Sequence, residues 1–177
     1  MSGTLARRPA APSIDIQVQS PLWDAEPAAG DTVRAAVAAA AQALSTEAGE
    51  VSIVLADDSA VRALNRDWRG IDKPTNVLSF PAAKINGAAP MLGDIVIAYE
   101  TLRRECADED RIFLHHLAHL TVHGFLHLIG YDHETDREAE EMEGLESRIM
   151  MRMNMPDPYL GRDLEPGPGR SPGDARA

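Results

Sequence analysis

Residues 123–133 read HGFLHLIGYDH, a stretch that predicts a helix ending in a tight turn beside a metal ion. His123 and His127 are four residues apart, so on a helix their imidazoles lie one turn apart on the same face. Gly130 can take the left-handed conformation that ends a helix and turns the chain back, which brings His133 towards the same point. Three imidazoles with an open fourth position are typical of a catalytic zinc site. We therefore predict that His123, His127 and His133 bind one Zn²⁺ ion per chain.

Three more histidines and one aspartate lie close to this group in the sequence. We expect His119 to be an outer partner of the ligands or a structural residue, and His115 and His116 to be exposed or incidental. Asp132 has two interpretations. It orients an imidazole as an outer carboxylate, or it is an exposed aspartate of the turn.

The spacing His-x3-His-x2-Gly-x2-His matches the metzincin proteases, whose motif is H-E-x-x-H-x-x-G-x-x-H. In those enzymes the residue after the first histidine is the glutamate that activates the zinc-bound water. Here that residue is Gly124, which cannot accept a proton. The pattern thus indicates the geometry of a zinc hydrolase without the general base of a peptidase.

Outward from this stretch, the pattern predicts a small α+β fold with a single domain. Alternating or continuous apolar runs predict four strands, at residues 14–19, 51–55, 76–80 and 93–98. Helices are expected from a cap at Asp31, from a cap at 57–59 through Leu64, over about 110–128 and over about 136–153. We predict a mixed four-stranded sheet packed with helices over residues 13–160. The Pro-, Gly- and charge-rich ends, 1–12 and 161–177, are predicted to be flexible extensions.

The charge of the chain is unevenly distributed. The formal net charge is −11, which by itself disfavours a polyanionic partner such as nucleic acid. However, seven acids fall between Glu134 and Glu146, where we expect a solvated helix face, whereas basic residues recur from Arg62 to Lys73. The aromatic content of 5% argues against extensive base stacking.

The absence of a long apolar run and the single cysteine, Cys106, favour a cytoplasmic protein without a disulfide.

Residues 64–81, LNRDWRGIDKPTNVLSFP, carry side chains suited to binding an anion. Arg69 stands at the entrance of the loop, directly before a glycine, and the planar guanidinium group suits a pair of phosphate oxygens. We predict that Arg69 acts in catalysis and, with Lys73, in substrate binding. The alternative for Arg69 is a surface ion pair with Asp67 or Asp72. The open edge of the third or fourth strand is also a candidate site for an extended peptide.

These blocks resemble one known family. HGFLHLIGYDH is similar to the H-G-x-L-H-L-x-G-Y-D-H signature of the YbeY family of bacterial ribosomal RNA maturation endoribonucleases. LNRDWRGIDKPTNVLSFP resembles a second block of that family, LGDIVIA its fourth-strand block, and EAEEMEGLE and DPYL its carboxyl-terminal part. The resemblance covers about residues 50–160.

The resemblance implies a metal-dependent hydrolase, usually assigned zinc, that cuts single-stranded RNA. It further implies a part in 16S ribosomal RNA 3′ end maturation, in rRNA processing and in ribosome quality control, with the small ribosomal subunit and assembly factors as partners and no membrane association. The ligands would be His123, His127 and His133, and the functionally important arginine would be Arg69.

Two other functions remain open at this point: a zinc metallopeptidase-like hydrolase, and a non-catalytic ribosome-assembly factor with a structural metal. The group that takes part in proton transfer during hydrolysis also stays open. The candidates are the water at the ion, the ribose 2′-hydroxyl of the substrate and a residue from elsewhere in the chain.

Overall fold

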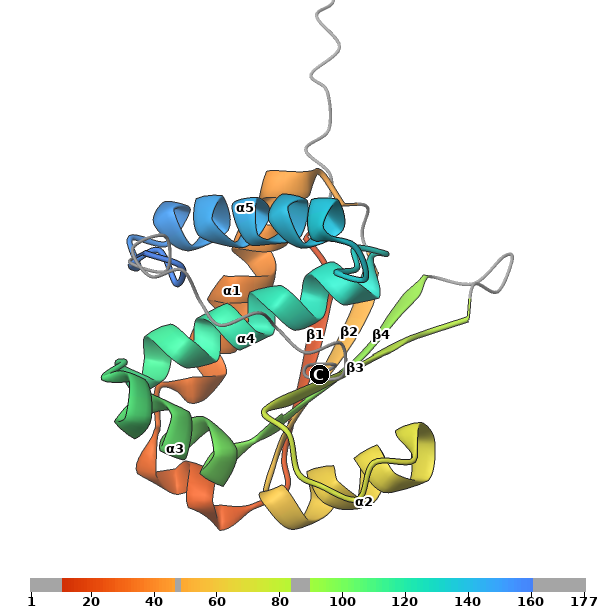
Figure 1. The fold of residues 1–177 in the computed structure, drawn as a ribbon, viewed down its shortest axis with the longest axis vertical. Coiled ribbons are helices and arrows are strands. Elements are labelled where there is room, and N and C mark those ends of the chain that lie inside the picture. The colour runs from red at the N-terminus through yellow and green to blue at the C-terminus, as the bar shows by residue number, and fades with distance from the viewer. Residues whose placement is uncertain (1–10, 47–48, 84–89, 161–177) are drawn as a thin grey trace, which may run out of the picture.

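The structure is a computed structural model that describes residues 11–46, 49–83 and 90–160. Strands and helices are mixed along the chain up to residue 98, and only helices follow in the described residues after it (Figure 1). In chain order the elements are β1 (Ser13–Val18), a 3-10 turn η1 (Pro21–Ala25), α1 (Ala29–Leu44), β2 (Glu50–Ala56), α2 (Asp58–Arg69), β3 (Val77–Pro81), β4 (Met91–Ala98), α3 (Tyr99–Glu109), α4 (Phe113–Leu128) and α5 (Asp136–Arg152).

The four strands form one mixed sheet in the order β1-β2-β4-β3. β1, β2 and β4 are parallel to one another, and β3 runs antiparallel to β4 at the edge. The predicted α+β fold with a small mixed four-stranded sheet is therefore confirmed. Since β4 lies inside the sheet, it is not an open edge for a peptide; β3 and β1 are the edge strands.

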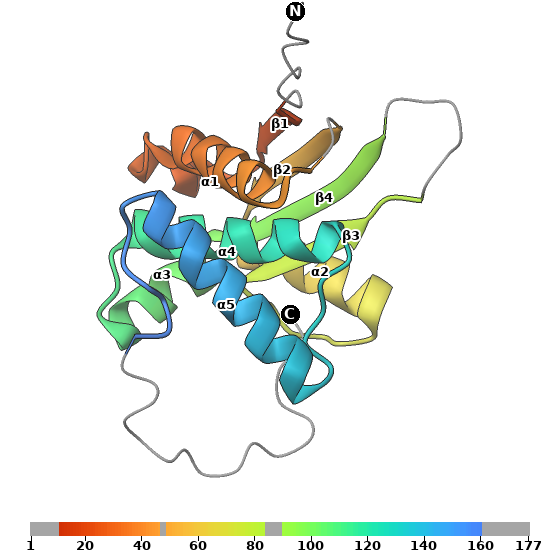
Figure 2. The ribbon, with the colours of Figure 1, turned by 90° about the horizontal axis from the view of Figure 1, so that it is seen from above.

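Helices cover both faces of the sheet, and side chains alternate between them as the pleat requires. On one face, α1 and α4 pack on the strands and α5 packs on α4, while α2 lies on the opposite face (Figures 1 and 2). In β4, Ile95 and Ile97 belong to the large core under α4, whereas Val96 and Ala98 belong to the small core under α2. In β3, Leu78 and Phe80 face α2, and Val77 faces the large core. The edge strand β3 thus separates α4 from α2.

The sequence predicted most elements and missed others. Helix α3 was not predicted as a separate element; no side chain caps its start, and its sequence is polar on average, so its apolar stripe is short. Asp31 is not a cap, because α1 begins earlier, at Ala29, and Asp31 lies in its first turn. Asp57 does cap α2, where its carboxylate accepts a hydrogen bond from Ala60 N–H at 2.9 Å.

Most of the expected flexible extension 1–12, and all of the tail 161–177, lie outside the described residues. Within the described ranges, none of the helices combines the length and the apolar character needed to cross a bilayer.

Candidate metal centre

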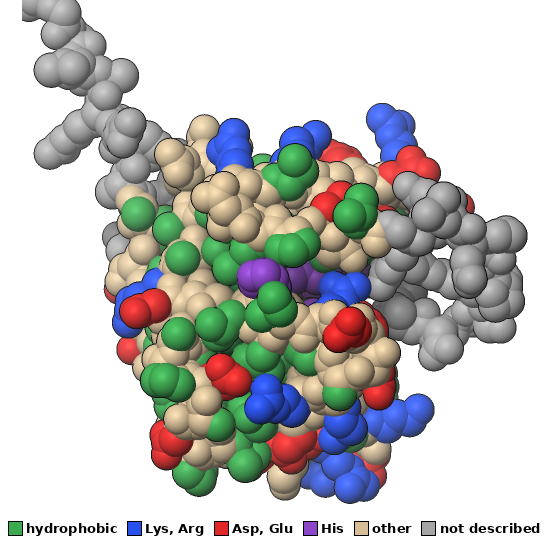
Figure 3. Space-filling model, turned by 90° about the vertical axis from the view of Figure 1, so that its left-hand side faces the viewer, with side chains coloured by type: hydrophobic (Ala, Val, Ile, Leu, Met, Phe, Trp, Pro, Cys, Tyr) green, Lys and Arg blue, Asp and Glu red, His purple; other side chains and the backbone are tan. Residues whose placement is uncertain are grey.

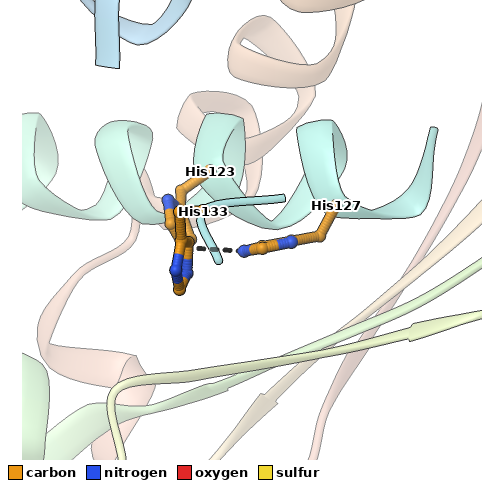
Figure 4. Close-up of side chains that lie close together, drawn as sticks. All are labelled: His123, His127 and His133. Carbon is orange, nitrogen blue, oxygen red and sulfur yellow. Dashed lines mark hydrogen bonds between the residues drawn. The ribbon is translucent and has the colours of Figure 1, made fainter. Parts of the chain in front are cut away.

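The end of α4 places the three histidines of the HGFLHLIGYDH stretch around one point. α4 packs on β3 and β4, and its last residues carry His123 and His127. Gly130 has a φ of +105°, and Tyr131 N–H closes the turn by donating to Leu126 C=O at 3.0 Å. Only glycine takes such a φ readily, so this residue allows the chain to reverse. The reversal returns His133 to the other two rings (Figure 4).

The geometry of the three rings fits a zinc ion. One ring nitrogen from each of His123, His127 and His133 lies within 4.8 Å of the other two. The Nε2 atoms of His123 and His127 are 3.1 Å apart. Tetrahedral zinc with Zn–N bonds of about 2.0–2.1 Å places two ligand nitrogens roughly 3.3–3.4 Å apart. The two rings on α4 therefore stand close to the separation that the ion requires.

The protonation state of His127 also suits a ligand. Burial, followed by electrostatic repulsion from the nearby rings of His123 and His133, lowers the pKa of His127 from 6.5 to about 4. At neutral pH the ring is consequently uncharged, and the uncharged ring is the form that binds a metal.

A buried carboxylate, that of Glu146 in α5, holds the ring of His123. The Glu146 side chain is 1% exposed, and its Oε1 accepts a hydrogen bond from Nδ1 of His123 at 2.5 Å. Its Oε2 lies 3.2 Å from Nε2 of His119 and accepts a hydrogen bond from the Tyr159 hydroxyl. Burial alone raises the pKa of Glu146, but the hydrogen bonds of His119 and His123 outweigh it and lower this pKa to about 2. Because Glu146 binds Nδ1–H of His123, Nε2 of that ring is left as the atom that faces His127.

Glu146 corrects two predictions from the sequence. It was counted among the acids of a solvated helix face, yet it is buried between α5 and α4. It also has the role that was considered for Asp132, because Glu146 is the outer carboxylate that accepts a hydrogen bond from a ring nitrogen of His123. Asp132 is exposed, and its Oδ1 accepts a hydrogen bond from the backbone N–H of His133 at 2.8 Å. The turn residue thus shapes the backbone that carries His133.

The carboxyl-terminal turn reaches this carboxylate from the other side. Asp157 accepts hydrogen bonds from Ser147 Oγ at 2.8 Å and from Tyr159 N–H at 2.9 Å, and Arg111 donates to Pro158 C=O at 3.1 Å. These contacts anchor the turn between α5 and the start of α4. They place the Tyr159 hydroxyl on Glu146, so the end of the domain is connected to the histidine group.

We predict that Glu146→Gln weakens zinc binding by about 10- to 100-fold, the range typical of outer partners of ligand histidines. The carboxamide keeps the size of the side chain, but its NH₂ group faces N–H donors and it loses the negative charge. Competition titration against a chromophoric chelator measures the affinity, and the visible spectrum of the Co²⁺ form reports the ligand geometry. Glu141→Gln, on the exposed side of the same helix, is the matched control. Zinc affinity equal to that of wild type in Glu146→Gln would contradict this role.

Gly124 faces the sheet and not the open side of the histidine group. A Cβ atom at this position would lie 3.0 Å from Ile95 Cγ2 and 3.1 Å from Ser79 Oγ, so the glycine lets α4 approach β3 and β4 closely. Ser79 Oγ uses this proximity to donate to Gly124 C=O at 3.3 Å. A side chain at this position would start in tight contact with Ile95 and Ser79 and would point towards the sheet, so these neighbours would have to shift to accept it. Position 124 therefore carries no general base of the metallopeptidase type, and it faces the sheet.

Arg69 shares a cleft with the histidines. It is the last residue of α2, and Gly70, with a φ of +71°, ends the helix after it. Its Nη2 donates to Ser79 C=O of the edge strand β3 at 3.2 Å. The cleft has a volume of about 350 Å³ and is lined by Arg69, by Ser79 and Pro81 of β3, by His127 and by residues 130–134. Histidine side chains reach the surface in the middle of one face of the molecule, with a basic side chain beside them (Figure 3).

The charge of Arg69 is not neutralised by the acids considered as its partners. Asp67 pairs with Arg66 at 3.0 Å, and Asp72 pairs with Arg62 at 2.8 Å. Among the residues that the structure describes, Arg69 forms no ion pair, so its guanidinium group can bind an anion in the cleft.

The remaining predicted residues lie in different surroundings. Lys73 is exposed in the loop after α2, where its C=O accepts from Asn65 at 2.9 Å. His119 is buried, and burial lowers its pKa despite the contact with Glu146. Of the two alternatives for His116, exposed or incidental, the first is wrong: its side chain is buried, with Nε2 3.4 Å from Glu105. His115 is half-buried.

Comparison with known proteins identifies similar sequences over most of the chain. A sequence model of the family described as Endoribonuclease YbeY matches residues 17–154. The endoribonuclease YbeY of Nitrobacter hamburgensis is 57% identical over 170 residues, which cover 92% of this chain and 89% of that protein. The endoribonuclease YbeY of a Bradyrhizobium species is 52% identical over 160 residues, 86% and 95% of the two chains. The solution structure of TM1509 from Thermotoga maritima aligns with a TM-score of 0.45 and 21% identity over 88% of this chain and 99% of that one.

Proposed function

The chain belongs to the endoribonuclease YbeY family, and on that basis we propose that it is a zinc-dependent endoribonuclease that cuts single-stranded RNA. One observation supports this most: His127 and His133 line the same cleft as Arg69, which forms no ion pair with the described residues. An enzyme that hydrolyses phosphodiesters needs a group for the scissile phosphate, and Arg69 can supply it. A metallopeptidase of the metzincin type has a glutamate after the first histidine, whereas this chain has Gly124, which faces the sheet.

The residues at the cleft would have different roles in the reaction. His123, His127 and His133 would hold the ion, which when bound lowers the pKa of water towards ~7 and polarises a phosphoryl oxygen. Arg69 would bind the non-bridging oxygens of the scissile phosphate and offset the charge that grows there in the transition state. Glu146 keeps the His123 ring in one tautomer and orientation. Ser79 C=O, which accepts from Arg69, keeps the guanidinium group at the cleft.

We further propose a role in ribosomal RNA processing in the cytoplasm, in particular in 16S rRNA 3′ end maturation and in ribosome quality control. Family membership supports this role. A net charge of −11 disfavours unspecific attraction to RNA. The chain would therefore need other molecules to bring the RNA to it. The small ribosomal subunit and its assembly factors would then present the single strand to the cleft.

The test is cleavage by the purified chain of three substrates: a single-stranded RNA with the 16S 3′ end sequence, the same sequence as a duplex, and casein. We expect cleavage of the single strand alone, loss of cleavage after metal removal and recovery with Zn²⁺, because the ligands bind the ion reversibly. Cleavage of casein would favour the metallopeptidase. A folded, zinc-loaded chain that cuts none of the substrates would favour an assembly factor with a structural metal.

A further inference from the structure

Trp68, near the end of α2, is exposed to an unusual degree for its residue type. Its relative exposure is 74%, whereas every other aromatic side chain in the described residues is buried or half-buried. Tryptophan is highly buried on average, so at this exposure an unusually large part of the ring is available to a ligand. The side chain is also held in place, since its ring packs edge-on against Phe80, with 6.2 Å between centroids and an angle of 61°.

Trp68 is connected to the cleft through Phe80. Phe80 lies on β3 between Ser79 and Pro81, both of which line the cleft, while its own ring is on the α2 face of the sheet. The guanidinium carbon of Arg69 lies 6.0 Å from the centroid of the same Phe80 ring. Trp68 and Arg69 therefore flank one ring at the edge of the sheet, where no further strand follows β3 in the described sheet. α2 lies beyond this edge (Figure 1). A chain bound by Arg69 in the cleft can therefore continue over the edge towards Trp68.

We propose that Trp68 is a stacking platform for one base of the RNA, on a nucleotide that flanks the phosphate bound by Arg69. This inference rests on the proposed function. Every base has a π-face, so stacking on an aromatic side chain tolerates any sequence and is a recurrent way of binding single strands. It does not occur with the bases of an intact duplex, which are stacked on each other, so it favours single-stranded RNA.

The charges around Trp68 agree with a contribution from stacking. The neighbouring arginines of α2, Arg62 and Arg66, are paired with Asp72 and Asp67. A chain with a net charge of −11 gains little from long-range attraction to RNA. A contact that does not depend on charge would therefore add to the RNA affinity that Arg69 provides. One platform of this kind is compatible with an aromatic content of only 5%.

The test compares a short single-stranded oligoribonucleotide with an abasic oligomer of the same length, both end-labelled, by fluorescence anisotropy on metal-depleted protein. We expect Trp68→Ala to bind the oligoribonucleotide about 5- to 100-fold more weakly than wild type, and the abasic oligomer equally well. Trp68→Phe should recover most of the affinity. Because Trp68 is exposed, the melting temperature of Trp68→Ala should match that of wild type.

Tryptophan fluorescence gives an independent signal. The second tryptophan, Trp23, is 3% exposed and donates its indole N–H to Ala56 C=O at 2.9 Å, so RNA cannot reach it. Quenching of wild-type emission by the oligoribonucleotide should thus come from Trp68 and disappear in Trp68→Phe. If wild type cuts RNA while Trp68→Ala binds the oligoribonucleotide as tightly as wild type does, the stacking role is overturned and the proposed function stands. If zinc-loaded wild type cuts no RNA, both are overturned.

Discussion

Replacing His127 with alanine is expected to reduce RNA cleavage to the level of metal-depleted wild type and to weaken zinc binding by at least about 100-fold. Removing an outer partner of a ligand already costs about 10- to 100-fold in affinity, and His127 is proposed as a ligand itself. The loss of Nε2, 3.1 Å from Nε2 of His123, leaves two imidazoles where three are required. Metal analysis of the purified protein and cleavage of single-stranded RNA measure the two effects.

His115→Ala is the matched control, because His115 lies on the same helix and outside the group of three. It should keep both zinc binding and cleavage. The fold of His127→Ala should survive, since the core beneath α4 consists of apolar side chains such as Phe125 and Leu126, both fully buried. Its thermal unfolding should match that of metal-free wild type. A variant that no longer folds, together with a zinc-loaded wild type that cuts nothing, would indicate a structural ion instead.

The histidine group could be predicted because its geometry is local. His123 and His127 are one helical turn apart, and the turn at Gly130 brings His133 back within a few residues. No information about distant parts of the chain is required. The same holds for the strands, whose apolar runs report burial directly.

Glu146 was not predicted, because its role depends on how α5 packs against α4. The signal was nevertheless present in the sequence. Met142, Ile149 and Met150 are buried at helical spacing, and position 146 falls on the same stripe. An acid on an apolar stripe requires a buried partner. The run of seven acids concealed this, since six of them are solvated or half-buried and only Glu146 faces the core.

Arg69 was predicted as an anion-binding residue, but the sequence could not decide whether it forms an ion pair. Its proximity to Asp67 and Asp72 in the sequence left an ion pair open, and only the positions of Arg62 and Arg66 decide which arginine each acid contacts. Its approach to the histidines also depends on strand order. β3 must be the edge strand for a residue of α2, on one face of the sheet, to reach a cleft beside α4 on the other.

Replacing Arg69 with alanine is expected to lower kcat/KM for single-stranded RNA by about 10²- to 10³-fold, the effect typical of losing one group that stabilises transition-state charge. Zinc content should stay at the wild-type level, because Arg69 belongs to α2 and is not a ligand. Arg69→Lys should recover only part of the rate, since an ammonium group cannot bind two phosphate oxygens as a planar fork. Single-turnover cleavage with zinc-loaded protein separates this effect from binding.

Arg66→Ala is the control that separates position from charge. Arg66 is one turn before Arg69 on α2, carries the same charge and is 55% exposed, but it pairs with Asp67. Exposed pairs of this kind contribute little, so this variant should keep the fold and most of the activity. An equal loss of cleavage in Arg66→Ala and Arg69→Ala would indicate a general effect of positive charge on RNA binding. Unchanged cleavage in Arg69→Ala would show that its guanidinium group does not act on the scissile phosphate.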